Sequence, residues 1–478
     1  MPESPLPGPD RGTPPVGAAD TGTLSTHAGT APLAYAPVPA VAGLMPTATS
    51  PRVAARVATA AAVGHIVEYY DFAVYALLAP VFAHIFFPSQ DHVAALLSTF
   101  AVFGVSYVVR PLGGIVFGHL ADKAGRRVTL AVVILLMSCA TTAVGLLPSH
   151  QSIGVAAPVL LVVCRCLQGL STGGEYGGSA SFVAESAPPG RRGFYTSWIM
   201  ASTAIGLTLG AVVGVLITSV VPRDVITGWG WRIPFLIALP LGIVGLYVRL
   251  KLDESPEFTA LSRSARIRKV PVVDAIRLYH RSIVHIFGLV LLLTVSFYVV
   301  FVYLTTYLNA FVGVPLTRAL PASIAAFVFL FALTPVFGRL SDRIGRKRVL
   351  MAGAIAEIVV AYPAFLLFRQ GSFGAIALAY AVLGASHATY LGPLTAALTE
   401  QFPPELRAAG LGIGYNLPVS VFGGLAPLVL TYLISTTHVA MMPAFYIIGS
   451  AAVTLAAVLT LKEPAPTDLA TRRADQPE

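Results

Sequence analysis

The stretch GHLADKAGRR at residues 118–127 returns as GRLSDRIGRK at residues 338–347, and each copy is a short basic loop between two long apolar segments. A second pair of segments repeats in nearly the same register. It matches Glu185, Pro188, Pro189 and Arg192 with Glu400, Pro403, Pro404 and Arg407. Two independent matches in one register indicate that the chain is a duplication of one pattern.

The composition places both halves in a membrane. Hydrophobic residues make up 56% of the chain and charged residues only 11%, against about 25% charged residues in a soluble globular domain. Mean hydropathy is +0.77. A helix needs about 20 apolar residues to cross a bilayer core of about 30 Å. The sequence therefore predicts an all-α membrane protein with twelve transmembrane helices, at 54–84, 93–117, 128–147, 155–186, 194–220, 232–250, 282–312, 319–338, 349–368, 374–402, 408–436 and 441–461.

The duplication also divides the chain into parts. We expect a disordered cytoplasmic tail at 1–50, an N-terminal six-helix bundle at 51–250, a cytoplasmic inter-bundle linker at 251–280, a C-terminal six-helix bundle at 281–463 and a cytoplasmic tail at 464–478. The first segment is rich in Pro, Gly, Ala and Thr without periodicity, so Met45 is an alternative start. Most of the 31 Lys and Arg lie in the tails and alternate loops, which puts both termini in the cytoplasm.

Charge, cysteines and motifs exclude several classes of function. The net charge of +9 lies mostly in short loops and not on a folded basic face, so nucleic-acid binding is not expected. Cys139, Cys164 and Cys166 lie in predicted helices at spacings that favour neither a disulfide nor a metal site. The chain has no Walker loop, no HExxH or GxSxG motif and no evident nucleophile–base pair. We therefore expect no enzyme activity, no ATP-driven transport, no cofactor and no metal.

The repeated G-x-L-x-D-x-x-G-R-[RK] loop resembles the signature of the major facilitator superfamily. Other segments resemble its metabolite:proton symporter branch, whose members carry proline and betaine, 2-oxoglutarate (alpha-ketoglutarate), citrate, shikimate and similar solutes with protons. These segments are GHIVEYYDFAVY (64–75), RPLGGIVFGHLADKAGRR (110–127), LQGLSTGGEYGGSASFVAES (167–186), RRGFYTSW (191–198) and GWGWRIPFLIALPLGIVGLYVR (228–249). The resemblance spans about 54 to 463. It is nearest to the proline/glycine betaine symporters, but the chain lacks the C-terminal coiled coil of the osmosensing members.

Three acids inside the predicted helices are candidate proton-coupling residues, ranked Asp71, Glu68 and Glu175. A charged side chain inside a membrane helix costs about 3 kcal/mol or more, so it needs a partner or a cavity. Glu68 and Asp71 are three residues apart on one helix face and repel each other when both are ionised, which favours proton binding by one of them. The alternative is that this helix end lies in water. His65 can share the proton.

Two arginines are candidates for binding a substrate carboxylate. Arg165 shares a helix face with Gln168 and Glu175, and it can instead pair with an acid of the first helix or hold helices together with Glu175. Arg110 precedes Pro111, and its alternative role is to bond backbone carbonyls freed by the proline. The resemblance implies a binding role for this arginine. Aromatic and polar side chains complete the predicted substrate site: Gln168, Tyr75, Tyr298, His387, Tyr390 and Asn416.

The two repeated loops carry candidate gating residues. Their charges can pair with helix ends on the cytoplasmic side in one conformation only, which would make a latch. The predicted set is Asp122, Arg126, Arg127, Asp342, Arg346 and Lys347, with Glu185, Arg192, Glu400 and Arg407 as partners. The alternative is that these basic residues only set the topology.

Together the patterns and the resemblance predict a secondary transporter of the bacterial inner membrane. We expect proton-coupled uptake of a small carboxylate or zwitterion, such as proline, glycine betaine, 2-oxoglutarate or citrate, by alternating access in a monomer within the lipid bilayer. Proton-antiport efflux and a non-transporting membrane sensor are the alternatives. Solute accumulation in vesicles under an imposed pH gradient separates the sensor from a transporter.

Overall fold

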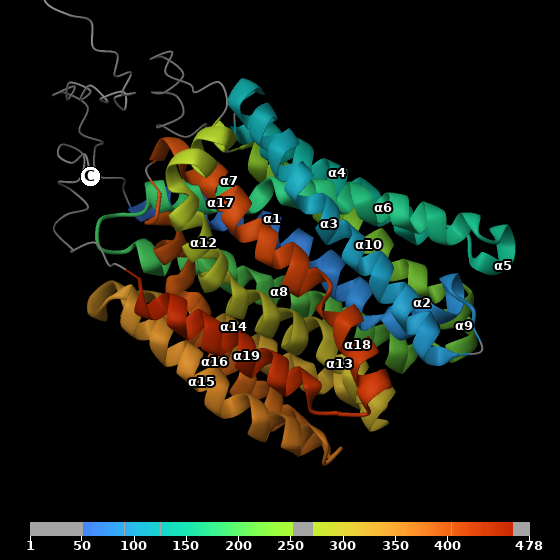
Figure 1. The fold of residues 1–478 in the computed structure, drawn as a ribbon. Helices are drawn as coiled ribbons and strands as arrows, with labels where there is room; N and C mark the ends of the chain where they lie inside the picture. Colours follow the sequence, from blue (N-terminus) through green and yellow to red (C-terminus); the bar gives the residue numbers. More distant parts are fainter. Residues whose placement is uncertain (1–50, 90, 125, 252–270, 403, 462–478) are drawn as a thin grey trace, which may run out of the picture. The chain divides into compact units, whose positions relative to one another are not determined.

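The chain is described by a computed structural model over residues 51–89, 91–124, 126–251, 271–402 and 404–461 (Figure 1). The described helices belong to one compact unit. The predicted tails at 1–50 and 464–478, and residues 252–270 of the predicted linker, lie outside the described residues. Helix α12 begins at Pro271 and is kinked at Tyr279, so the end of the predicted linker is helical.

The elements before the linker are α1 (Pro51–Leu77), α2 (Ala79–Phe86), α3 (His92–Ala124), α4 (Arg126–Leu146), α5 (His150–Ile153), α6 (Ala156–Gly173), α7 (Glu175–Ser186), α8 (Arg192–Val220), α9 (Arg223–Gly228), η1 (Gly230–Arg232) and α10 (Ile233–Leu250). Those after it are α12 (Pro271–Phe297), η2 (Tyr298–Tyr303), α13 (Leu304–Tyr307), η3 (Leu308–Val312), α14 (Leu316–Ile344), α15 (Arg346–Phe368), α16 (Phe373–Thr399), α17 (Pro404–Pro418), η4 (Val419–Gly424), α18 (Ala426–Thr437) and α19 (Met442–Leu459).

Eleven helices among the described residues are long and apolar enough to cross a bilayer, and the bent pair α1 and α2 makes a twelfth if it is one span. The predicted all-α fold is therefore confirmed. The bend of 62° between α1 and α2 falls at Leu78, just before Pro80. Proline lacks a backbone N–H and its ring clashes with the preceding turn, which explains why the predicted helix at 54–84 is not straight.

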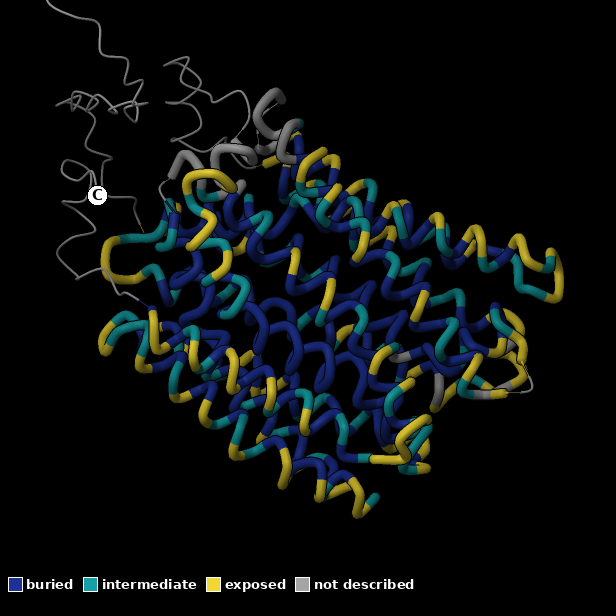
Figure 2. The backbone as a smooth tube through the Cα atoms, viewed as in Figure 1, coloured by how far each residue is buried: buried dark blue, intermediate teal, exposed yellow. Residues whose placement is uncertain are grey.

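The outer surface of the helices is apolar. Val108, Leu112, Val284 and Val359 are each more than half exposed, and many other large apolar side chains face outward with them. Figure 2 shows this pattern as exposed positions recurring along the outer helices around a buried interior. An apolar surface of this extent requires lipid contact, so the chain is a multi-pass membrane protein.

Close helix crossings join the two halves. Helix α8 of the first half packs along α14 of the second, and α3 packs against α17 and η4. At Gly193 and Gly338 the two backbones approach so closely that a Cβ at either position would collide with the backbone of the other helix. Gly338 of the repeated loop therefore permits a crossing between halves. Gly345, at φ +99°, makes the sharp turn between α14 and α15.

Candidate functional site

Three ion pairs lie inside the first half, and each joins an acid to an arginine on another helix. The pairs are Glu68–Arg110 (2.9 Å), Asp71–Arg165 (3.2 Å) and Glu175–Arg249 (2.7 Å). All six side chains are buried. Since an unpaired charge is costly in this environment, the pairing explains how the helices tolerate six charged groups, whose formal charges sum to zero.

The Glu68–Arg110 pair joins α1 to α3 and is only partly saturated. Arg110 Nη2 donates to Glu68 Oε1 at 2.9 Å. Among the described residues, Glu68 Oε2 and the Nε and Nη1 atoms of Arg110 have no hydrogen-bond partner. His65 Nδ1 lies 3.7 Å from Glu68 Oε2, which is too far for a hydrogen bond. The pair thus holds an open acceptor and two open donor atoms in a buried place.

In the Asp71–Arg165 pair both oxygens of the acid are bonded, whereas Arg165 Nε and Nη2 have no hydrogen-bond partner among the described residues. Asp71 Oδ1 accepts from Gln168 Nε2 at 2.8 Å, and Oδ2 accepts from Arg165 Nη1 at 3.2 Å. Gln168 also accepts from Arg165 at 2.7 Å and donates to Thr141 at 2.9 Å. The guanidinium lies 3.8 Å from the centroid of the Tyr75 ring, a cation–π contact. This cluster ties α1, α4 and α6 together.

Glu175 pairs with Arg249 near the end of α10, a residue that the sequence analysis did not single out. The predicted structural network between Arg165 and Glu175 is therefore wrong, because each has a different partner. Helix α6 ends at Gly173 and Glu175 begins α7, so the two residues do not share one straight helix. At Gly64 of α1, a Cβ would collide with both members of the Glu175–Arg249 pair. Glycine at position 64 leaves room for the pair.

A void of about 10 Å³ lies between the halves. Its first-half lining includes Tyr69, Met200 and Thr203, and its second-half lining includes Phe297, Tyr298 and Tyr415. A volume of about 10–15 Å³ by this measure holds one water molecule, so the void has no room for an organic solute. Arg110 lies 5.9 Å from the centroid of the Tyr107 ring, and Tyr107 meets the ring of Tyr298, which lines the void, edge to face at 5.3 Å, so the Glu68–Arg110 pair lies next to the lining of the void.

A buried acid–imidazole pair lies in the second half. His387 Nδ1 is 3.0 Å from Glu357 Oε1, which also accepts from Ser296 Oγ at 3.0 Å. Glu357 Oε2 and His387 Nε2 have no partner among the described residues. The rings of Phe297 and Phe301 flank the imidazole. His387 therefore does not line the void itself but packs behind Phe297, which does.

The other predicted substrate-binding residues differ in position. Tyr298 lines the void, as a substrate contact would. Tyr390 donates its hydroxyl to the Leu289 carbonyl, and a Cβ on Gly353 would collide with its backbone, so it packs inside the second half. Asn416 Nδ2 donates to the Gly173 carbonyl at 3.1 Å, a contact between the halves.

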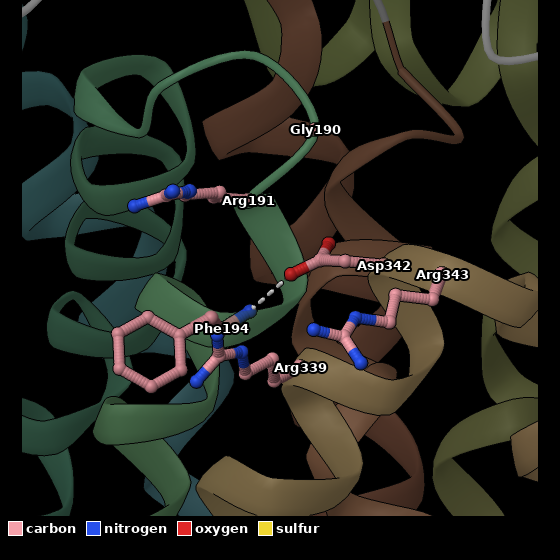
Figure 3. A pocket seen from close by; sticks show the side chains of 6 residues that line it. All are labelled: Gly190, Arg191, Phe194, Arg339, Asp342 and Arg343. Carbon is pink, nitrogen blue, oxygen red and sulfur yellow. Dashed lines mark hydrogen bonds between the residues drawn. The ribbon is translucent and has the colours of Figure 1, made fainter.

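A latch of charged residues joins the halves at one end of the helices. The backbone N–H groups of Gly193 and Phe194, at the start of α8, donate to Asp342 at 2.8 and 2.9 Å. Glu185 of the first half pairs with Arg407 of the second at 3.2 Å. We call Glu185, Asp342 and Arg407, with the two backbone groups, the latch. Figure 3 shows the Asp342 carboxylate pointing at the α8 backbone, beside Arg191, Arg339 and Arg343, which line a pocket of about 380 Å³.

Neighbouring charges support the latch from within the second half. Arg346 pairs with Asp342 at 2.6 Å and with Glu400 at 3.5 Å, and Arg192 of the first half interacts electrostatically with Glu400. Lys347 donates to the carbonyl of Leu459 at 2.6 Å, so this bond stays inside the second half. The side chains of three further predicted gating residues lie outside the described part of the structure: Asp122, Arg126 and Arg127.

Comparison with known proteins places this geometry in a family. Residues 57–270 match the model of the sugar (and other) transporter family, and residues 315–477 match that of the major facilitator superfamily. The chain is 38% identical over 416 residues to the proline/betaine transporter of Escherichia coli (strain K12), covering 85% of this chain and 83% of that protein. The chain belongs to the major facilitator superfamily.

A second curated relative and a solved structure agree with this family assignment. It is 36% identical over 416 residues to the glycine betaine/proline/ectoine/pipecolic acid transporter OusA of Dickeya dadantii (strain 3937), covering 85% of this chain and 83% of that one. The fold matches a solved structure of the proton:xylose symporter XylE with a TM-score of 0.71 at 17% identity, over 86% of this chain and 96% of that chain. The predicted family resemblance is confirmed, and the protein is a membrane transporter and not an enzyme.

Sequence reasoning missed several residues at the centre of this transporter. Arg249 stands in the last turn of a predicted helix, two residues before Lys251, so its position in the sequence is that of a basic residue that sets the topology. Tyr69, Phe297 and Tyr415 lie in apolar helices, where an aromatic side chain is usually a packing residue. For Tyr69, its position directly after Glu68 was the one feature of the sequence that could have indicated a role in the site.

Proposed function

We propose that this transporter carries a small zwitterionic solute of the proline and glycine betaine kind into a bacterial cell together with protons, by alternating access. The relatives named above support the solute class. The observation that carries the proposal is the Glu68–Arg110 pair, which has an open acceptor and open donors and lies next to the lining of a void between the halves, through Tyr107 and Tyr298. A carboxylate substrate needs such a cation, and a proton-coupled carrier needs such an acid.

Glu68 is the proposed coupling acid, ahead of Asp71, which the sequence ranked first. Both oxygens of Asp71 already accept hydrogen bonds from charged or amide donors, whereas Glu68 Oε2 is open to a proton. A proton on Glu68 removes the counter-charge of Arg110. The substrate carboxylate can then take the place of Glu68 on Arg110, which keeps the guanidinium paired, and the single positive charge that the proton adds is then carried by the cationic end of the solute.

In this scheme the open donors of Arg110 receive the carboxylate. Protonation and substrate binding then favour each other, because a proton alone leaves Arg110 without its counter-charge, and the substrate alone brings a second carboxylate that competes with Glu68 for Arg110. A proton alone adds one positive charge to a neutral set of three acids and three arginines. This mutual dependence is the coupling that symport requires.

Alternating access follows from the closed void and the latch. A solute cannot fit in about 10 Å³, so the halves 51–250 and 281–463 must separate at one end to admit it. We propose that the latch faces the cytoplasm, since it lies among the basic loops, and that the release of Asp342 and Arg407 from the first half opens that side. We further propose that a monomer carries out this cycle in the inner membrane, with both termini in the cytoplasm.

Transport by purified protein in proteoliposomes tests the proposal. Wild type should accumulate glycine betaine or proline when an inward proton gradient is imposed. Glu68→Gln should lose this accumulation but retain exchange of labelled for unlabelled solute at fixed pH, since exchange needs no change in protonation. Gradient-driven accumulation by Glu68→Gln would refute the assignment of the coupling acid. Wild-type accumulation under an outward gradient would favour efflux, and no transport at all would favour a sensor.

A further inference from the structure

Four aromatic rings surround the central void, and both halves contribute them. The rings of Tyr69 and Phe297 meet edge to face with centroids 5.4 Å apart, and Phe297 and Tyr298 meet in the same way at 5.4 Å. The fourth ring, Tyr415, stacks on Tyr176 at 3.7 Å. Edge-to-face packing holds each ring in a fixed orientation. The rings therefore form a defined aromatic lining between α1, the α12–η2 junction and α17.

The lining contains no charged hydrogen-bond acceptor, and besides the Thr203 hydroxyl its side-chain acceptors are the phenolic oxygens of three tyrosines. The lining residues include no carboxylate, and the hydroxyl of Thr203, its one threonine, donates to the Met200 carbonyl at 2.6 Å. An ammonium group bearing N–H bonds would lose hydrogen bonds to water here without full replacement. A quaternary ammonium has no N–H to satisfy, and the faces of aromatic rings attract it. The chemistry of the lining therefore suits a methylated cation.

The position of Arg110 fixes how a zwitterion would lie. Arg110 lies against the Tyr107 ring, 5.9 Å from its centroid, and Tyr107 packs edge to face at 5.3 Å on Tyr298, one of the four rings that line the void. A solute whose carboxylate binds Arg110 would thus place its other end among these rings. We infer that Tyr69, Phe297, Tyr298 and Tyr415 form the subsite for the cationic end of the solute, and that they favour a quaternary ammonium group. This inference rests on the proposed function and extends it to the residues that recognise the substrate.

The subsite also explains why the solute promotes closure. Tyr69 belongs to the first half and the other three rings to the second, so the full set surrounds the cation only when the halves meet. Attraction between a cation and a ring is strongest when water is excluded. Binding of the cationic end therefore favours an occluded arrangement, in which the rings stand further apart than around the void of about 10 Å³, over the open ones.

A pair of isosteric ligands tests the inference. Glycine betaine and 3,3-dimethylbutanoate share a carboxylate and a bulky trimethyl end, but the second has carbon in place of the charged nitrogen. Competition for labelled glycine betaine exchange at fixed pH gives the apparent affinity of each. Wild type should bind glycine betaine about tenfold more tightly than 3,3-dimethylbutanoate, within the range expected for a desolvated cation–π contact.

Variants then locate the preference. Phe297→Leu removes a ring but keeps an apolar side chain, and the preference should fall to about twofold. Phe301→Leu is the matched control, because Phe301 packs on Phe297 at 5.3 Å but does not line the void, and it should keep the preference. If Phe297→Leu does not fold, Tyr298→Leu takes its place in the test. Tyr298→Phe keeps the ring, so it should prefer glycine betaine over 3,3-dimethylbutanoate as wild type does.

The outcomes separate this inference from the proposed function. Equal affinity of wild type for the two ligands, or an unchanged tenfold preference in folded Phe297→Leu and Tyr298→Leu, would overturn the inference while leaving symport intact. Wild type that transports neither glycine betaine nor proline would overturn both. A preference lost in Phe301→Leu as well would show that the effect is general to core packing and would also overturn it.

Discussion

Replacing Asp342 with Asn should shift the transporter away from the conformation in which the latch is closed. The carboxylate accepts two backbone hydrogen bonds from Gly193 and Phe194 across the halves. A hydrogen bond to a charged group contributes about 1.5–3 kcal/mol, and the amide oxygen of Asn can retain one neutral bond of about 1 kcal/mol. Taking the lower values for this partly exposed site, the variant should lose about 2–3 kcal/mol of latch energy, a roughly 30- to 150-fold shift in the equilibrium.

Distance measurements between spin labels on the two halves report this shift. Pro189 and Ile344 are exposed positions on opposite sides of the latch, and labels there can be attached in a background without the three native cysteines. Asp342→Asn should move the distance distribution toward longer values and raise the ratio of open to closed molecules by the factor given above.

Lys347→Gln is the control for that experiment. It removes a charge five residues away whose bond to the Leu459 carbonyl lies within the second half, so the distribution should stay close to that of wild type. If Asp342→Asn leaves the distances unchanged, or if Lys347→Gln changes them equally, the two backbone bonds to Asp342 do not hold this side closed.

Three other variants probe the buried charges. Gly64→Ala should lower the free energy of unfolding by about 1–3 kcal/mol, because the new Cβ collides with an ion pair. Gly178→Ala is the control, because a Cβ there meets open space and should not lower stability. Equal unfolding temperatures for the two variants would contradict this prediction. Arg110→Lys keeps the charge but loses the planar fork, so KM for solute should rise about tenfold or more, and an unchanged KM and rate would make Arg110 structural. Glu357→Leu should destabilise the protein by about 3–5 kcal/mol, and His387→Leu should also destabilise it, because each leaves a buried partner unpaired. The double variant should recover part of that stability, and additive losses in the double variant would refute the pairing.

Much of the fold was predictable because its signals are local and repeated. The two basic loops fixed the duplication, and long apolar segments fixed the helices. The bend at Leu78 was not predicted, although Pro80 is visible in the sequence, because proline is common in transmembrane helices and does not always break them. The division of the helix at 155–186 near Gly174 was missed for a related reason, since glycine also serves close packing.

The sequence predicted most of the charged residues of the candidate site, but it did not predict which acid pairs with which arginine. Glu68, Asp71, Arg110 and Arg165 stood out because charge is rare in membrane helices. Which acid meets which arginine depends on how helices rotate against one another, and spacing within a single helix does not contain that information. The latch shows the same limit. The sequence indicated Asp342, but its partners are backbone N–H groups, which have no sequence signature.

The most direct test of proton-coupled transport is to record proton movement caused by the solute itself. Purified transporter is placed in proteoliposomes in weakly buffered medium with no imposed gradient, and glycine betaine or proline is added outside while external pH is followed. We predict that external pH rises as solute enters, in proportion to the amount taken up, and that Glu68→Gln gives no such rise. Uptake of solute by wild type with no change in external pH would contradict the account.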